Sequence, residues 1–407
     1  MSKRSVSHLI IILAPFVFSF AFGLDIYIPI VPKMSEIFET SVSMVHLTLS
    51  LFLLMTGAGQ LLIGPMSDLW GRKRIFYASS TCYALGSLAC AYSPTIYIFI
   101  FARLISALGS CGMLVTAFAL VRDLFSEEES SKMYSFLNGA VGVSPTLAPI
   151  IGGYLASYFG WRSIFYFLFF IGASGLLITF FFIQETLPKE KRVPINKEIF
   201  QRYKNIYIHP LFFCFSMLAG IAEAVFFCFF SISPFIIIEI LGIPTHQFGF
   251  YFAAFGSVIA FGGFASGKVV ERLGTKTTII IGIFLMFLGG FGMISWYYLY
   301  DLTLAGFLTP MVIACIGAMF LVGASAGEAL EPFPETAGTA AAAFGSVEFG
   351  FSSLIGALLM QFSNTNTVPY GICILLLAVG ASSFFLYALK IKKSLASIDL
   401  TLSTKKP

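Results

Sequence analysis

Long apolar runs separated by short polar segments make up most of the chain. Runs such as residues 166–183 are continuously apolar, and a helix needs ~20 such residues to cross the hydrocarbon of a bilayer. A transmembrane β-barrel would show ~10-residue segments of alternating polarity instead. The pattern predicts twelve membrane-spanning helices, near residues 8–30, 46–67, 75–93, 95–121, 133–159, 162–184, 211–238, 246–270, 276–297, 301–328, 336–361 and 368–392.

Composition supports an all-α membrane protein. The chain is 58% hydrophobic and 11% charged, with a mean hydropathy of +0.91. A soluble protein of 407 residues cannot bury that much apolar surface, whereas lipid solvates it. The first run lacks a small-residue cleavage site and ends in Pro29 and Pro32, so we expect a retained first span rather than a signal peptide.

The basic residues lie on alternate connections between the spans. If the N-terminus is inside, all but three of the 24 Lys and Arg residues fall on inward-facing segments. Lys33 and Arg162 face outward, and Arg103 lies within a span. This asymmetry predicts that both termini lie in the cytoplasm. The outward loops are very short and carry no Asn-x-Ser/Thr glycosylation acceptor, so we expect a bacterial inner-membrane protein. Because the basic segments are short and close to the membrane, we expect no nucleic-acid partner.

One long polar stretch, residues 185–210, separates six spans from six. We therefore expect an N-terminal six-helix bundle at 1–186, a cytoplasmic linker at 187–210 with a short surface helix near 197–207, a C-terminal six-helix bundle at 211–393 and a cytoplasmic tail at 394–407.

A short motif recurs in the two halves. Residues 64–74 read GPMSDLWGRKR and residues 267–276 read GKVVERLGTK. Glycine, acid, glycine and base recur in register, which indicates a six-plus-six repeat. The alternative is that each segment is only a basic inward-facing loop, and this alternative is stronger for the second copy.

Several motifs resemble the major facilitator superfamily, and in particular its twelve-span drug–proton antiporters of the bicyclomycin and chloramphenicol resistance subfamily. Residues 64–74 resemble the superfamily signature between spans two and three. The other matching segments are 25–32 (DIYIPIVP), 103–109 (RLISALG), 144–153 (SPTLAPIIGG), 160–162 (GWR), 185–188 (ETLP) and 329–340 (ALEPFPETAGTA). Ser106 and Glu348 depart from the family, which commonly has Gln at both positions.

The resemblance implies two pseudo-symmetric six-helix bundles around a cavity that opens to each side of the membrane in turn. It also implies proton-driven export of small lipophilic or amphipathic compounds, with a proton-coupled transporter of a specific metabolite or siderophore as the alternative. An integral-membrane enzyme would need polar clusters at one membrane face, which the sequence lacks. We expect a monomer that binds a small-molecule substrate, protons and lipid, and that uses the proton gradient with no cofactor or metal.

Ionisable residues within spans are costly, by ~2.5–3.5 kcal/mol on insertion scales, so their default interpretation is functional. Asp25 and Arg103 lie at similar depths, and the resemblance implies that Asp25 carries protons; a structural ion pair is the alternative. Glu223 and Glu348 lie near the middle of spans seven and eleven. We expect both glutamates and Ser106 to face the substrate cavity. There either glutamate could balance the charge of a cationic substrate or carry a second proton. The alternative is a protonated, structural Glu. Glu328 lies near the inner end of span ten.

Two further groups of residues are candidates for conformational gating. Gly64, Asp68, Gly71 and Arg72 form the first turn motif, in which the glycines allow a tight reversal and the charges fix the helix ends. Span five carries Pro145, Pro149, Gly152 and Gly153, so it can bend and pack closely against a neighbouring helix. The alternative for span five is the ordinary Gly and Pro content of transmembrane helices.

Overall fold

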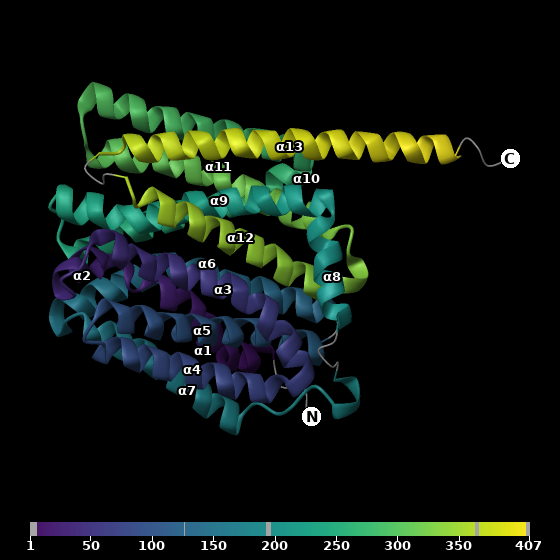
Figure 1. Cartoon of the computed structure of the whole chain (residues 1–407), viewed down its shortest axis with the longest axis horizontal. Coiled ribbons are helices and arrows are strands. Elements are labelled where there is room, and N and C mark those ends of the chain that lie inside the picture. Colours follow the sequence, from purple (N-terminus) through teal and green to yellow (C-terminus); the bar gives the residue numbers. More distant parts are fainter. Residues whose placement is uncertain (1–5, 126, 193–196, 363–365, 404–407) are drawn as a thin grey trace. The chain divides into compact units, whose positions relative to one another are not determined.

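Helices account for nearly all of the computed structural model, which describes residues 6–125, 127–192, 197–362 and 366–403. The remaining residues of the expected termini and linker lie outside this description. The long helices run side by side within each part of the chain (Figure 1). They are α1 (Val6–Asp25), α3 (Val42–Trp70), α4 (Arg72–Tyr92), α5 (Ile96–Leu124), α6 (Glu127–Phe159), α7 (Arg162–Phe181), α9 (Pro210–Pro234), α10 (Thr245–Tyr300), α11 (Leu304–Leu330), α12 (Ala337–Leu359) and α13 (Val368–Ser403).

The twelve expected spans are confirmed. Ten helical segments of the described chain are long and apolar enough to cross a membrane. One of them, α10, is two helices joined at Gly274, whose backbone is not helical (φ 78°, ψ 163°). The twelfth span is α4, whose many small and hydroxyl-bearing residues lower its hydropathy although it packs along α5 and α7. Small residues on both helices let α4 and α5 approach closely: a Cβ on Gly86 of α4 would lie 2.7 Å from the backbone nitrogen of Ser106, and one on Gly109 of α5 would lie 2.4 Å from that of Tyr83.

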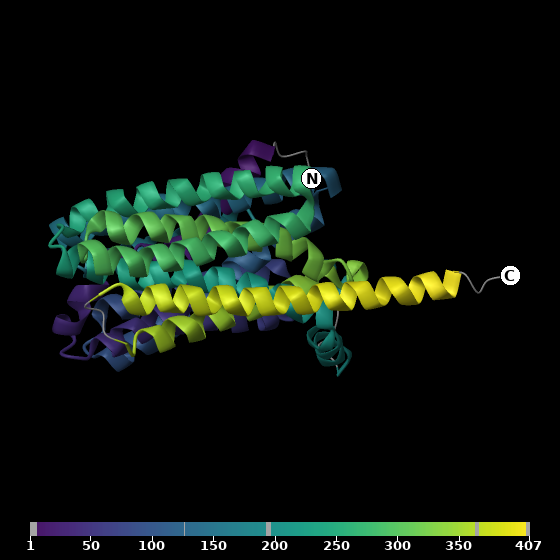
Figure 2. The ribbon, with the colours of Figure 1, turned by 90° about the horizontal axis from the view of Figure 1, so that it is seen from above.

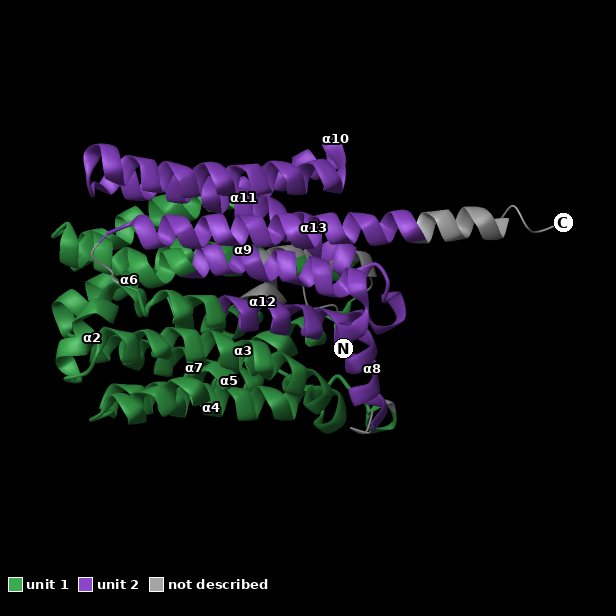
Figure 3. Cartoon of the chain, turned by 45° about the horizontal axis from the view of Figure 1, so that its top comes forward, with its two compact units in different colours: residues 1–196, 228–260, 353–365 green, residues 197–227, 261–352, 366–407 purple. Residues whose placement is uncertain are grey.

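The chain forms two compact units, shown in green and purple in Figure 3. Unit 1 comprises Met1–Asn196, Cys228–Ala260 and Ser353–Thr365, and unit 2 comprises Lys197–Phe227, Phe261–Ser352 and Asn366–Pro407. Helices α9, α10 and α12 therefore contribute to both units. The two units are defined by which segments contact one another, whereas the expected boundaries at 186, 210 and 393 come from the repeat in the sequence. Those boundaries therefore remain a prediction.

Aromatic side chains fill the core of unit 1. Tyr27 follows α1, and its ring lies 5.6 Å from Phe99 of α5 and 5.7 Å from Phe165 of α7. Phe16 of α1 and Phe76 of α4 lie 4.4 Å apart. These rings are completely buried, so the interior of the unit is packed around α1.

One end of unit 1, here called the closed end, brings short segments and helix ends together. It contains the 3-10 helix η1 (Ile28–Ile30), α2 (Val31–Ile37), the start of α3, the end of α6, the π-helix η3 (Phe235–Ile240) and the start of α10. A Cβ on Gly152 would lie 2.0 Å from the carbonyl oxygen of Ile26, and one on Gly249 would lie 2.6 Å from Cα of Ile150. The helices therefore meet here with backbone touching backbone.

Unit 2 shows the same close packing. Cβ atoms on Gly282 of α10 and Gly317 of α11 would each lie within 2.6 Å of the other's carbonyl oxygen. Helix α13 runs past the end of α11 (Figure 2), and its Lys392 pairs with Glu328 and lies 3.9 Å from Glu331. Glu328 is therefore an ion-pair partner at this end of unit 2.

The polar stretch between the halves contains the expected short helix, α8 (Lys197–Ile208). It lies across the direction of α9 (Figure 1), from which His209 alone separates it. The hydroxyl groups of Tyr207 and Ser346 lie 2.5 Å apart and fix α8 to α12. Residues 193–196 of the expected linker lie outside the described residues.

Candidate functional site

Asp25 ends α1 inside unit 1. The chain leaves the helix there because Pro29 and Pro32 start η1 and α2 instead of continuing α1. Asp25 is 4% exposed, and the hydroxyl of Ser144 on α6 donates to its Oδ2 at 3.1 Å. An ionisable group is thus held at the contact between α1 and α6.

Arg103 of α5 reaches the same end of α1. Its Nη1 donates to the carbonyl oxygen of Gly23 at 2.7 Å, two residues before Asp25, and its guanidinium lies 4.2 Å from the Phe52 ring centre and 5.1 Å from that of Tyr27. The side chain is 1% exposed, and Nε and Nη2 have no hydrogen-bond partner among the described residues. The aromatic faces stabilise the cation, and two donors remain for a further acceptor.

From the sequence, Asp25 and Arg103 are related only by their similar depth in the membrane. In the structure both lie at the same end of α1. Sequence reasoning assigned no role to Ser144, although it lies in the matched segment 144–153. It also assigned none to Phe52, because an aromatic residue in an apolar run carries no signal of its own.

Glu223 and Glu348 also lie together, in unit 2. Helices α9 and α12 touch near them, since a Cβ on Gly220 would lie 3.2 Å from Cβ of Phe351. The two carboxyl groups are close enough to interact electrostatically, and Glu223 interacts in the same way with Cys315 of α11. Neither glutamate has a cationic partner within the described chain. Two unpaired carboxyl groups at membrane depth form a site that favours a proton or a positively charged ligand.

Ser106 lies inside a helix contact. It is 1% exposed, and a Cβ on Gly86 of α4 would lie 2.7 Å from its backbone nitrogen. The backbone of Ser106 thus lies at the contact of α4 with α5, and its buried hydroxyl has no hydrogen-bond partner among the described residues. Its role as a substrate contact stays a prediction.

The proline- and glycine-rich part of α6 packs against the start of α10. A Cβ on Gly249 would lie 3.0 Å from the carbonyl oxygen of Pro149, and one on Gly256 would lie 3.4 Å from the carbonyl carbon of Pro145. Gly152 faces Ile26, as described above, and a Cβ on Gly153 would lie 2.9 Å from the carbonyl oxygen of Thr245. Sequence reasoning identified the α6 side of this seam and missed the glycines of α10, which are seven residues apart and therefore share a helix face.

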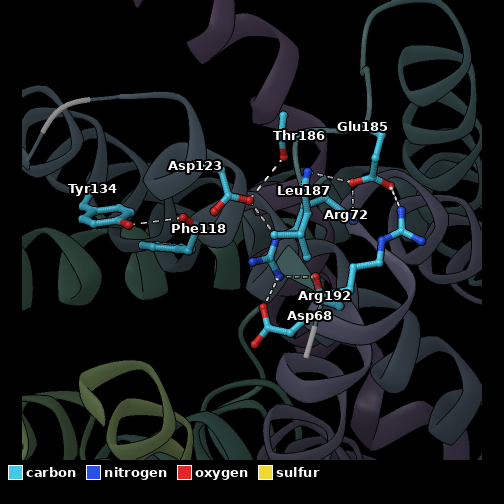
Figure 4. Close-up of polar contacts among 10 residues, drawn as sticks. Asp68, Arg72, Phe118, Asp123, Tyr134, Glu185, Thr186, Leu187 and Arg192 are labelled. Carbon is cyan, nitrogen blue, oxygen red and sulfur yellow. Dashed lines mark hydrogen bonds and ion pairs between the residues drawn. The ribbon is translucent and has the colours of Figure 1, made fainter. Parts of the chain in front are cut away.

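The first turn motif carries a network of charged groups around Arg72, whose side chain is 3% exposed (Figure 4). Its Nη1 lies 2.7 Å from Oδ1 of Asp68, and its Nε donates to Oδ2 of Asp123 at 2.8 Å. The backbone nitrogen of Arg72 donates to Oε1 of Glu185 at 2.9 Å, and Glu185 also pairs with Arg192. The network joins the ends of α3, α4 and α5 to the segment after α7. Sequence reasoning named Asp68 and Arg72 but neither Asp123 nor the bond to Glu185.

The backbone confirms that the turn motif is repeated. Gly71 has φ 97° and ψ 155°, and Gly274, its counterpart, has φ 78° and ψ 163°. Only the surroundings differ: a Cβ on Gly71 would lie 2.2 Å from Oε2 of Glu185, whereas one on Gly274 would meet nothing within 4 Å. Gly64, the first glycine of the motif, also has no neighbour within 4 Å of a Cβ.

Replacing Gly71 by Ala should therefore cost more than replacing Gly274 by Ala. Both alanines would carry the strain of a positive φ, about 1–3 kcal/mol, but Gly71→Ala would also displace Glu185 from Arg72. We expect a clearly larger drop in thermal stability in detergent for Gly71→Ala. Adding Glu185→Ala to both variants should remove the difference. Equal losses in the two single variants would show that the Glu185 contact is dispensable.

Comparisons with known proteins agree along most of the chain. The family model described as Major Facilitator Superfamily matches residues 13–357. The chain is 30% identical to a bicyclomycin resistance protein homolog of Haemophilus influenzae over 86% of this chain and 87% of that protein. It is 28% identical to a chloramphenicol resistance protein of Pseudomonas aeruginosa over 90% and 86% of the two chains.

Solved structures show the same fold. The partially occluded, inward-open xylose transporter XylE from Escherichia coli superposes with a TM-score of 0.72 at 14% identity, covering 95% of this chain and 99% of that one. A bacterial homolog of the human lysosomal transporter Spinster gives a TM-score of 0.70 at 16% identity, covering 95% and 98%.

Proposed function

The chain belongs to the Major Facilitator Superfamily, and from this premise we propose that it exports small lipophilic or amphipathic compounds in exchange for protons by alternating access. The observation that carries the proposal is the buried Asp25, bonded to Ser144 next to the Arg103 site. A carboxyl group at this depth is costly unless it is used. The names of the relatives, which are resistance proteins, support drug-like compounds over a single metabolite or siderophore.

Asp25 has the chemistry of a proton carrier. Its helix contact with α6 lies next to the seam at which α6 meets α10, so movement at the seam changes the surroundings of the carboxyl. Burial penalises the charged carboxylate, whereas a nearby guanidinium stabilises it. The unpartnered Nε and Nη2 of Arg103 allow Arg103 to bind the carboxylate after the proton has left.

The remaining site residues have supporting roles in this proposal. Glu223 and Glu348 balance the charge of a cationic substrate or hold a second proton. Pro145, Pro149, Gly152 and Gly153 let the seam of α6 open and close. The network of Gly71, Asp68 and Arg72 fixes the helix ends at the other end of unit 1 and so limits which conformations are stable.

We propose that this other end, with Arg72 and Arg192, faces the cytoplasm of a bacterial cell and that the closed end faces outward. Both termini would then be cytoplasmic. A proton moving inward would release ~2.3 kcal/mol per 100 mV of membrane potential and ~1.4 kcal/mol per pH unit. No cofactor is needed for such coupling.

Everted membrane vesicles test the proposal. After the lumen has been acidified, addition of chloramphenicol or the cation ethidium should release protons from the lumen, as read by a pH-sensitive dye. Vesicles without the protein should show no release. Proton uptake with either compound would indicate symport, and no response to a panel of lipophilic probes would contradict multidrug export.

The same vesicles check the orientation. A membrane-impermeant maleimide should label Asn196→Cys in everted vesicles and fail to label it in intact cells. The unsubstituted chain, which has seven native cysteines, gives the background. Labelling in intact cells would overturn the proposed topology.

A further inference from the structure

His46 lies in the second turn of α3 at the closed end of unit 1. Its side chain is 1% exposed, and its ring lies 4.7 Å from that of Phe235 in η3. Neither ring nitrogen has a hydrogen-bond partner in the part of the chain that the structure describes. A buried histidine that bonds to nothing is unusual, because each unmet polar group costs about 1–3 kcal/mol.

This arrangement holds His46 only in its neutral form. A protonated imidazole would place a positive charge and two unbonded N–H groups inside an apolar contact. That costs considerably more than burying the neutral ring. A proton on His46 is therefore incompatible with the packing against Phe235.

The contacts around His46 are those that must separate when the closed end opens. Ser43, in the preceding turn of α3, donates to the carbonyl oxygen of Met360 at 3.3 Å. Gly153 of α6 abuts Thr245 at the start of α10. If α3 and α6 move away from η3, α10 and the end of α12, His46 leaves Phe235 and meets water.

We propose that His46 is a proton-binding residue of the outer gate, which takes up a proton from outside only while the closed end is open and then prevents closure until it is released. The inference rests on the proposed function, because that proposal gives the closed end its outward direction. His46 is separate from Asp25, which lies at the end of α1, and it gives external pH a direct effect on the conformational cycle.

Other charged groups lie on the elements that pack here. Lys33 and Glu36 are on α2, Glu239 is on η3 and His246 is in the first turn of α10. Glu36 and Glu239 interact with each other electrostatically, and none of the four is hydrogen-bonded to the imidazole.

His246 provides a matched control. It also lies at the closed end, with its ring 6.5 Å from that of Tyr154, but it is only partly buried. The ring of His246 is therefore not enclosed as that of His46 is, and replacing His246 should leave the pH dependence of opening unchanged.

The size of the effect follows from linkage between proton binding and opening. An imidazole in water takes up a proton near pH 6.5, whereas the closed end admits only the neutral ring. The open-to-closed ratio should therefore rise about fourfold between pH 8 and pH 6.

A cysteine in place of Thr245, which is 9% exposed in the closed end, reports opening through its rate of reaction with a membrane-impermeant maleimide. The rate is measured from outside in proteoliposomes, with no substrate and no proton gradient. Each rate is divided by that of His46→Phe with the same reporter, which cancels the intrinsic pH dependence of the thiol. The protein without the reporter gives the background.

The ratio should rise about fourfold from pH 8 to pH 6. His46→Gln, which keeps a polar group but cannot gain a charge, should behave like His46→Phe, and His246→Phe should behave like the unsubstituted protein. A ratio that stays flat, or a rise that disappears with His246→Phe, would overturn the proposal. The labelling assay needs neither substrate nor gradient. If the vesicles show no antiport, the result for His46 therefore still stands, and a negative result for His46 leaves the antiport measurement unaffected.

Discussion

Asp25→Asn should reduce proton-driven accumulation in everted vesicles to the level set by passive exchange. With one proton per substrate, 100 mV and one pH unit together supply about 3.7 kcal/mol, enough for a gradient of several hundred-fold. Asparagine keeps the shape of the side chain and can still bond to Ser144, but it cannot take up and release a proton. The expected gradient is therefore about one, with substrate binding and downhill exchange retained.

A buried hydroxyl about two helical turns beyond Arg103 on α5 provides the control. Ser110 of α5 is fully buried and donates to the carbonyl of Ala107 in its own helix, so Ser110→Ala tests the effect of disturbing the same bundle. It should leave the gradient unchanged. Wild-type accumulation by Asp25→Asn would show that the proton is carried elsewhere, and Glu348 followed by Glu223 would become the candidates.

The spans were predictable because each one is a continuous apolar segment of the sequence. The apolar runs predicted all twelve, including residues 75–93, although the hydropathy of α4 is lower than that of the other spans. The recurrence of the motif predicted a turn between spans eight and nine, and Gly274 supplies it with the same backbone conformation as Gly71.

The side-chain partners were not predictable, because they come from distant parts of the chain. Glu185 lies 113 residues from Arg72, and Asp123 lies 51 residues from it. Ser144 lies 119 residues from Asp25. Asp25 and Arg103 were predicted to lie at a similar depth because each was counted in residues from the outer end of its span. Such a count gives the depth of a residue but not the direction in which its side chain faces. For that reason the expectation that Ser106 faces the cavity stays a prediction, although its backbone lies at the contact of α4 with α5.

His46 shows the same limit in a different form. A single histidine near a span end carries no pattern, and burial is the observation that gives it meaning. Its position next to Phe235 depends on η3, a π-helix after Pro234 that apolar periodicity does not distinguish from an α-helix.

Removing one carboxyl group of the Glu223–Glu348 pair should weaken export of cations and spare neutral compounds. Glu348→Gln is nearly isosteric and leaves Glu223 as the only acid of the pair. Loss of one charged partner at a desolvated site costs roughly 1–2 kcal/mol, which corresponds to about a five- to thirtyfold rise in KM. Ethidium should show this loss in the vesicle assay, and chloramphenicol, which is neutral, should not.

The two single variants and the double variant together distinguish a cation site from a structural pair. If both carboxyl groups serve the cation, Glu223→Gln should resemble Glu348→Gln, and the double variant should abolish ethidium export while chloramphenicol export continues. Equal losses for the two probes would mean that the pair stabilises the contact of α9 with α12 near Gly220. Unchanged ethidium export in both single variants would exclude the pair as a substrate site. Asp25 would keep its coupling role in either case, because its loss affects accumulation of every substrate whatever its charge.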